Sequence, residues 1–481
     1  MINNYINEIE KKIKFIFGKH LGYNSAFIEN KDYLLTFLFF KYISDLNEYD
    51  SHKIKIPKEA SYQFIYEKRD NENLGELLNT ALKIIDKDAY PNELRGLFKG
   101  IDYTSERVFG HVEQQNKILK SLINEFKHIK LDPKHIDTRS MGRIYRRLIE
   151  NFHIFNVKKA EFAPTPESIS SLVAQLVQPE SGDKIHDPTA GSGSLLIRVA
   201  EEVKGEDFSL YAQEKNRNLY VLLKMNAIIN GMDKNLEDVE CGDILTNPLI
   251  LNNNQLMKFN VVVAHPPFSM KVDEYELYNK DFYKRFERGI PPASKADYAF
   301  ISHLVSVMDD KNGRAAIILP HGVLFRGGNE EIIRKALIEE DLIDAVIGLP
   351  SKLIYGTGIP ITIIILKKNR NKGNILFIDA SNYFTNKNTT VNELSEEHIH
   401  EIVSVYNNYK GKKNYASVAD KESIRQNGYN LNISRYVDTF EKESNVDEDK
   451  ILEKIDILEN KIHKTQSELR KYLLEIKDLN F

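Results

Sequence analysis

The sequence predicts a doubly wound α/β domain that follows a helical N-terminal domain and precedes a long C-terminal helix. From about residue 160 to 380, short β-branched runs alternate with helical stretches. This pattern is typical of a parallel sheet with helices on both faces. The runs are nearly continuous in apolar character, as expected for strands that are buried on both sides. Before residue 155, apolar residues instead recur at the three- and four-residue spacing of helices.

Residues 1–155 are expected to form several helices. Leu34, Leu35 and Leu38 are apolar residues at helical spacing, and Gly and Pro are sparse within such stretches. A basic helix face is expected near the end of this domain, and it is either an ordinary solvated surface or a contact for phosphates. Its members are Arg139, Arg143, Arg146 and Arg147.

Strands are expected in the second domain, which spans residues 156–440. Each is a short apolar run bounded by polar or turn residues. The runs are Lys184–His186, Phe208–Ala212, Phe259–Ala264, Ala315–Leu319, Ile343–Gly348 and Ile361–Lys367, and a further short strand is expected just before Cys241. Residues 381–440 are polar and are expected to be irregular.

The third segment, residues 441–481, is expected to form one helix over about residues 446–480. Ile451, Ile455 and Leu458 fall near a heptad rhythm with Glu and Lys between them. This rhythm indicates an apolar seam along the helix. The seam is expected to dock either on its own protein or on a partner helix.

The composition limits the class of function. With 42% apolar and 28% charged residues, bulk disorder is not expected. The net charge of −4 does not suggest a nucleic-acid binder, although a local basic face or a partner chain can supply phosphate contacts. Cys241 is the only cysteine, so an intramolecular disulfide and a cysteine-based zinc site are excluded, and no metal is expected. No signal peptide and no membrane-length apolar run is found, which predicts a cytoplasmic protein without membrane contact.

A glycine-rich turn follows the first expected strand, in the run His186-Asp-Pro-Thr-Ala-Gly-Ser-Gly-Ser194. Glycines let the backbone approach a ligand closely, and ligands of open α/β sheets bind at the carboxyl ends of strands. No Lys follows the last Gly, so this is not a phosphate-binding P-loop, and the spacing is not the Gly-x-Gly-x-x-Gly of dinucleotide sites. On its own, the turn is equally consistent with a tight structural turn.

Two acidic residues after later strands favour a ligand site over a purely structural turn. Glu214 ends the second expected strand, where a carboxylate can accept hydrogen bonds from both ribose hydroxyls. Asp243 follows the next helix and a short strand, where it can contact the edge of an adenine. Together with the glycine turn, these acids describe a nucleoside-type pocket at three successive strand ends.

A further strand ends in His265-Pro266-Pro267-Phe268. Adjacent prolines fix the backbone and remove two amide donors, which leaves carbonyl oxygens free to accept from an amine. Phe268 can stack on a flat base. Taken alone, the run is also consistent with a proline-rich strand exit and a buried Phe.

The order of these features resembles the amino-group DNA methyltransferases, and in particular the N6-adenine enzymes, which carry an (Asn/Asp/Ser)-Pro-Pro-aromatic motif after a strand. The run Phe162-Ala-Pro-Thr-Pro166 is similar to the family segment that precedes the glycine turn and closes over the cofactor. Further stretches resemble the methyltransferase (M) subunit of type I restriction-modification systems. They are Phe39–Asp45, Ser294–Phe300, Ile318–Gly328, Ile347–Pro350 and Tyr355–Pro360.

The resemblance implies a Rossmann-like methyltransferase domain that uses S-adenosyl-L-methionine and methylates N6 of an adenine flipped out of DNA. The implied catalytic set is His265, Pro266, Pro267 and Phe268, with the Pro266 carbonyl accepting from the amine and Phe268 stacking on the base. The implied cofactor-binding residues are Phe162, Thr165, Pro166, Asp187, Thr189, Gly191, Ser192, Gly193, Glu214 and Asp243.

The resemblance also implies partners. These are DNA, a specificity (S) subunit that reads the DNA sequence, a second M subunit, and a restriction subunit with helicase and nuclease activity. The apolar seam of the C-terminal helix would then dock on the specificity subunit.

His265 departs from the family, which usually has Asn at this position. A neutral His offers one acceptor and one donor, but an ordinary imidazole would be partly charged near neutral pH, and its charged form has no acceptor. Loss of one well-placed transition-state contact lowers a rate by roughly 10²–10³-fold. His265 is therefore an inactivating or engineered substitution, a variant that still works, or the mark of a catalytically silent subunit that binds cofactor and DNA for assembly.

Protein-glutamine methyltransferases are a further alternative, because they share an Asn-Pro-Pro-Tyr-like motif. The helical N-terminal domain and the stretches after residue 290 argue against this class.

Overall fold

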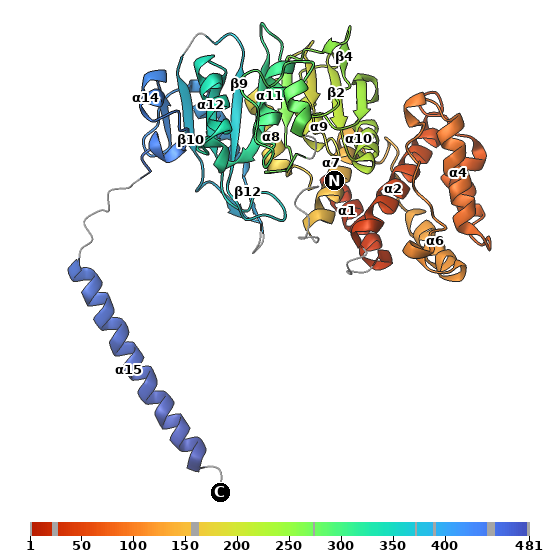
Figure 1. Ribbon diagram of the computed structural model, residues 1–481. Coiled ribbons are helices and arrows are strands. Elements are labelled where there is room, and N and C mark those ends of the chain that lie inside the picture. The colour runs from red at the N-terminus through yellow and green to blue at the C-terminus, as the bar shows by residue number, and fades with distance from the viewer. Residues whose placement is uncertain are drawn as a thin grey trace. The chain divides into compact units, whose positions relative to one another are not determined.

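The computed structural model describes residues 2–21, 27–154, 163–272, 275–370, 373–387, 391–439 and 448–478. These residues fall into two units that divide between Val437 and Asp438, and Figure 1 colours them along the chain. The predicted domain boundaries at residues 155 and 440 lie outside the described residues and stay predictions.

The N-terminal part of the first unit is helical, as predicted. Its helices are α1 (Ile2–Leu21), α2 (Phe27–Tyr49), α3 (Tyr62–Glu67), α4 (Leu74–Asp88), α5 (Glu106–Phe109), α6 (Val112–Phe126) and α7 (Thr138–Ile154), drawn in red to orange in Figure 1. One hydrophobic core joins them. Aromatic rings pack edge to face within this core. The ring centroid of Phe37 lies 5.4 Å from that of Phe126 and 6.0 Å from that of Phe40.

Buried polar residues in the stretch Phe39–Asp45 form hydrogen bonds and an ion pair within this helical part. Lys41 and Asp45 form a buried ion pair one turn apart on α2. Asp45 also accepts a hydrogen bond from the amide of Leu131 at 2.9 Å, and the Ser44 hydroxyl accepts from the amide of Tyr62 at 3.1 Å. These contacts give the stretch a structural role, since buried charges are tolerated when they are paired and hydrogen-bonded.

The second part of the first unit is built on a sheet in the order β13-β10-β8-β9-β7-β6-β1-β2-β3. In β1 the pairing places His186 beside Tyr211 of β2 on one side and beside Val262 of β6 on the other, and both pairings are parallel. The bounds are β1 (Lys184–Asp187), β2 (Ser209–Glu214), β3 (Leu236–Cys241), β6 (Val261–Ala264), β7 (Arg314–Pro320), β8 (Ile343–Gly348), β9 (Ile361–Lys367), β10 (Ile375–Asp379) and β13 (Ala416–Ala419). Two short hairpins, β4–β5 (Leu251–Asn252, Gln255–Leu256) and β11–β12 (Thr385–Asn386, Asn392–Glu393), lie outside this sheet.

Helices cover both faces of the sheet, as predicted for the doubly wound class. One core includes side chains of α8 (Glu167–Val177), α9 (Ser194–Ala200) and α13 (Glu396–Asn408). A separate core on the other face includes side chains of α11 (Asp297–Val307), α12 (Asn329–Glu339) and α14 (Lys421–Gln426). The prediction of an α/β fold preceded by helices is therefore confirmed.

Helix α10 (Arg217–Ile229) belongs to two cores at once. Leu222 and Met225 pack into the core of the N-terminal helices, while Leu223 packs into a core of the sheet. The helix begins directly after β2, where the Asn216 side chain accepts hydrogen bonds from the amides of Asn218 and Leu219. The end of β2 is thus tied to the helical part of the chain.

Two expectations for the sheet domain were wrong. Residues 381–440 are not irregular, because α13, β13 and α14 lie within them. In α13, Ile399, Ile402 and Tyr406 are buried at helical spacing, but the polar residues between them hid this pattern. The sheet is also not entirely parallel, since β9 runs antiparallel to β7 and β8, and β13 runs antiparallel to β10.

The second unit contains α15 (Glu448–Asp478), which confirms the long C-terminal helix. Its apolar residues include Leu458 and Ile462, which are exposed by 58% and 55%. None of the helices in the described ranges is both long and apolar enough to cross a membrane.

Candidate functional site

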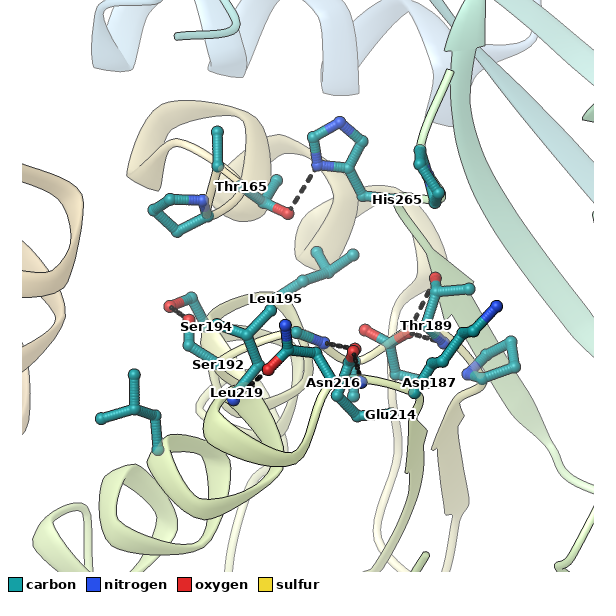
Figure 2. Close-up of a pocket in the computed structure, with 18 of the residues that line it drawn as sticks. Thr165, Asp187, Thr189, Ser192, Ser194, Leu195, Glu214, Asn216, Leu219 and His265 are labelled. Atoms are coloured by element: carbon teal, nitrogen blue, oxygen red, sulfur yellow. Dashed lines mark hydrogen bonds between the residues drawn. The ribbon is translucent and has the colours of Figure 1, made fainter. Parts of the chain in front are cut away.

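A cavity of 380 Å³ lies at the carboxyl ends of four strands, β1, β2, β3 and β6. Because the first three of these strands are neighbours in the sheet, the turn after β1 and the acids after β2 and β3 meet at one edge. Figure 2 shows Asp187, Glu214 and Asn216 on one side of the cavity and Thr165 and His265 on the other.

The glycine turn between β1 and α9 forms part of the cavity wall. Gly191 has φ +56° and Gly193 has φ +79°, a left-handed conformation that glycine adopts without strain. A Cβ atom on Gly193 would lie 2.9 Å from Leu223 Cγ, whereas a Cβ on Gly191 would meet nothing within 4 Å. Gly193 therefore permits close packing on α10, and Gly191 leaves room in the cavity that it lines.

A chain of polar contacts connects the glycine turn to the helical part of the chain. The buried Asn226 side chain donates to the Ser192 carbonyl at 3.0 Å, and Asn230 donates to Asn226 Oδ1 at 3.0 Å. Arg146 donates to Asn230 Oδ1 and pairs with Glu201 at 2.7 Å. Arg147 is also paired, with Glu10 at 3.3 Å.

The expected basic face is thus corrected for Arg146 and Arg147, since both form ion pairs within the fold. Arg139 and Arg143 are exposed.

Glu214 is held in place by the backbone on both sides of its carboxylate. The amide of Gly191 donates to Oε2 and the amide of Asn216 donates to Oε1, both at 2.7 Å. Burial raises the pKa of Glu214 above its ordinary value. Each oxygen retains a lone pair for a further donor from the cavity, as two ribose hydroxyls would supply.

Asp187 is buried at the end of β1. Its Oδ1 accepts from the amide of Thr189 at 2.9 Å. Burial, with a contribution from the charge of Glu214, raises the pKa of Asp187 to about 7. A cationic ligand group beside Asp187 would favour the ionised carboxylate.

Asp243 lies on a loop that is held by the buried side chain of Gln213. Gln213 donates to the carbonyls of Gly242 and Asn247 at 3.1 and 2.8 Å. The Asp243 carboxylate accepts from the amide of Leu245 at 3.0 Å and pairs with Lys215 at 2.9 Å. The carboxylate is therefore oriented before any ligand binds.

His265 follows β6 and faces Thr165, which precedes α8. Thr165 Oγ1 lies 3.0 Å from His265 Nδ1, the contact dashed in Figure 2. Burial lowers the pKa of His265 to about 4. This lowered pKa favours the neutral ring near pH 7, which keeps one acceptor nitrogen, over the partly charged imidazole expected from the sequence.

Asp297 fixes the loop that follows the two prolines. This fully buried carboxylate accepts from the amide of Ser269 at 2.9 Å and pairs with Arg326. Ser269 has φ +50°, a strained conformation that must be held by its surroundings. The Phe268 ring is half-buried and tilted by 57° to the ring of His265, at 5.4 Å between centroids.

Most of the site residues predicted from the sequence line this cavity. The lining includes Thr165, Asp187, Thr189, Gly191, Ser192, Glu214, Asp243, His265 and Pro267. Pro166, Gly193, Pro266 and Phe268 lie next to lining residues in the chain but do not line the cavity themselves. Phe162 lies outside the described residues.

Three lining residues come from the helical part of the chain and were not predicted. Lys31 and Leu35 belong to α2, and Ile149 belongs to α7. Burial lowers the pKa of Lys31. No local motif marks these residues, because they reach the cavity through the packing of α2 and α7 on α10.

Comparison with protein-family models finds two matches. Residues 136–445 match the family described as N-6 DNA Methylase, and residues 26–126 match the HsdM N-terminal domain. The first match covers more than half of the chain.

Two methylase subunits are similar to this protein over most of the chain. The MjaVII methylase subunit of a type I restriction enzyme from Methanocaldococcus jannaschii is 31% identical, over 98% of this chain and 86% of the relative. The MpnII methylase subunit from Mycoplasma pneumoniae is 31% identical, over 86% of this chain and 79% of the relative.

A solved structure has the same fold. It is the type I restriction-modification methyltransferase subunit from Streptococcus thermophilus, with a TM-score of 0.82 and 30% identity, and the alignment covers 90% of this chain and all of that one.

Proposed function

This chain belongs to the N-6 DNA methylase family as a methyltransferase subunit of the type I restriction-modification class, and on that premise we propose that it methylates N6 of adenine in DNA with S-adenosyl-L-methionine. The observation that carries the proposal is that one cavity is lined by Asp187, Glu214, Asp243 and His265. The reaction needs acids that bind a nucleoside and a strand end that accepts from an amine, and the residues proposed for both roles line one cavity.

The residues present fit S-adenosylmethionine. The cavity of 380 Å³ is within the size range of small-molecule sites. Glu214 would accept from the ribose hydroxyls and Asp243 would face the adenine edge. Asp187 and the backbone at Gly191 would hold the methionine part, for which the missing Cβ of Gly191 leaves space. When bound, this cofactor supplies a methyl carbon that the amine nitrogen attacks, while the carbon–sulfur bond breaks and its electron pair remains on sulfur.

The chain's own residues would prepare the amine for this attack. The Pro266 carbonyl would accept one hydrogen of the amine and the neutral His265 ring the other, which increases electron density on the nitrogen. Phe268 would stack on the flipped base. Asp297 would hold this loop in place through the amide of Ser269.

DNA and other subunits are the proposed partners. A specificity subunit would select the DNA sequence, and α15 would dock on it through its apolar seam. A second copy of this chain would complete the methyltransferase, and a restriction subunit with helicase and nuclease activity would join it.

The test is methyl transfer from labelled S-adenosylmethionine to DNA by the chain purified with its cognate specificity subunit. We expect labelled N6-methyladenine, and we expect equilibrium dialysis to show one cofactor site per chain. Failure of the complex to bind the cofactor would refute the proposal.

A second candidate function is favoured by His265 alone, since the family usually has Asn there. On this alternative the chain binds cofactor and DNA for assembly but does not transfer a methyl group. A His265→Asn variant separates the two, because activity confined to the variant supports the silent subunit and activity in both excludes it. The match to the N-6 DNA methylase family argues against a protein-glutamine substrate.

A further inference from the structure

His265 has one hydrogen-bond partner among the described residues, and it is a hydroxyl. Thr165 Oγ1 lies 3.0 Å from Nδ1. Figure 2 shows this contact from the segment before α8, with Nε2 on the opposite side of the ring. Both side chains line the cavity. The ring is thus held at Nδ1, and no hydrogen bond to Nε2 is found among the described residues.

Thr165 is itself fixed in place. It stands between Pro164 and Pro166, and each proline locks its own φ and restricts the residue before it. Pro166 accepts from the amide of Ser170 at 2.9 Å at the start of α8. The backbone that carries the Thr165 hydroxyl is therefore restrained, and the hydroxyl faces His265 from it.

A neutral imidazole can make this contact in two ways. If the Thr165 hydroxyl donates to Nδ1, the ring hydrogen is on Nε2, and Nε2 can only donate. If Nδ1–H donates to Thr165, Nε2 carries the lone pair and can accept. Only the second arrangement lets His265 replace the acceptor oxygen of the usual Asn, because an amine hydrogen facing Nε2–H would be repelled.

We propose that Thr165 is a positioning residue that selects the His265 tautomer with its hydrogen on Nδ1, so that Nε2 accepts an amine hydrogen of the target base. This inference rests on the proposed function. In this tautomer Thr165 Oγ1 accepts from Nδ1–H.

The proton balance follows from this tautomer. After N6 has gained the methyl group it carries one proton too many, and that proton passes to Nε2. The ring is then an imidazolium, with Nδ1–H still donating to Thr165. When the methylated base leaves, Nε2 releases the proton to water and the starting tautomer returns. An imidazole is a sufficient base for this step, because the protonated N6-methylated amine is a far stronger acid than an imidazolium.

The tautomer can be measured without any methyl transfer. We expect nitrogen-15 NMR of the full chain, labelled at histidine, to show a neutral ring with a protonated Nδ1 at His265, and a His265→Asn variant identifies the signal. Thr165→Ser keeps the hydroxyl and should keep this tautomer. Thr165→Val keeps the shape without the hydroxyl and should lose it. A wild-type ring protonated at Nε2 would overturn the inference, and this result is independent of whether the chain is active.

A double-mutant cycle tests the consequence for catalysis. In the His265 background, Thr165→Val should lower the rate of methyl transfer by up to about tenfold, the effect of one hydrogen bond, and Thr165→Ser should restore it. In the His265→Asn background, Thr165→Val should change the rate far less, because an amide has no tautomer to select. Equal losses in both backgrounds would show that Thr165 acts elsewhere and would overturn the inference.

Discussion

Arg285 donates a hydrogen bond at 2.8 Å to the backbone carbonyl of Ile244, the residue after Asp243. The same guanidinium donates to the carbonyl of Leu245 at 2.7 Å and pairs with Asp281, and it is 2% exposed. A buried cation from the segment after the His265 strand therefore holds the loop that carries Asp243. The loop that carries Asp243 and the segment that follows β6 are thus joined by Arg285.

Arg285→Lys should weaken cofactor binding. Lysine retains the charge but cannot hold two carbonyls and a carboxylate in one plane, so the Asp243 loop loses its orientation. We expect the dissociation constant for S-adenosylmethionine to rise roughly tenfold, the effect of about 1.4 kcal/mol, in calorimetric titration. Arg288→Lys is the matched control, because Arg288 lies in the same segment and pairs with Glu340 away from this loop. Equal affinity in wild type and Arg285→Lys would contradict this role of Arg285.

Cofactor affinity should depend on pH through Asp187. The pKa of this carboxyl is about 7 in the free protein, so it takes up a proton as the pH falls through 7 and loses the charge that favours a cationic ligand. We expect the affinity to fall by up to about tenfold per pH unit between pH 7 and 5.5. Asp187→Asn should bind more weakly, without this dependence. A wild-type affinity that is constant from pH 7.5 to 5.5 would rule out the assignment.

Asp297→Asn should slow methyl transfer and leave cofactor binding intact. The variant keeps an oxygen for the amide of Ser269 but loses the charge that pairs with Arg326, so the strained loop after Phe268 is held less firmly. We expect the turnover number to fall on the order of tenfold or more, with the dissociation constant for the cofactor unchanged. Asp310→Asn, at a residue whose side chain is 72% exposed, serves as the control. A parallel loss of cofactor affinity would show that the effect is not confined to the loop.

The two glycines of the turn should respond differently to alanine. In Gly193→Ala the new Cβ meets Leu223 and the backbone is left-handed, so we expect the free energy of unfolding to fall by about 1–3 kcal/mol in urea titration. Gly191→Ala carries the same left-handed strain, but its Cβ meets no atom within 4 Å and enters the cavity, so we expect a smaller loss of unfolding free energy together with a loss of cofactor affinity. If Gly191→Ala bound the cofactor normally, the cofactor would not lie against the turn.

Features that depend on local sequence were predictable. The turn after β1, Glu214 at the end of β2 and Asp243 after β3 lie where the apolar runs end, because a parallel strand order follows from alternating strands and helices. The apolar rhythm likewise located α15 within two residues of its bounds.

Features that depend on packing between distant segments were not predictable. Lys31 and Leu35 reach the cavity only because α2 packs on α10. No sequence pattern within α2 predicts this packing. The lowered pKa of His265 also arises from burial by distant segments. The direction of β9 was missed because an apolar run has the same appearance in parallel and antiparallel strands.

Helix α10 limits how far this protein is modular. The two family matches divide the sequence near residue 130, which suggests parts that could be exchanged between relatives. Yet Leu222 and Met225 fill the core of one part, and Leu223 fills the core of the other and packs on Gly193. A chimera with its junction between the matched regions would take α10 from the parent that supplies the sheet. One side of α10 would then pack on its own sheet, and the other side would have to pack on N-terminal helices from a different parent. Functional exchange therefore requires the donor's contact residues on α10 to be transferred together with its N-terminal helices.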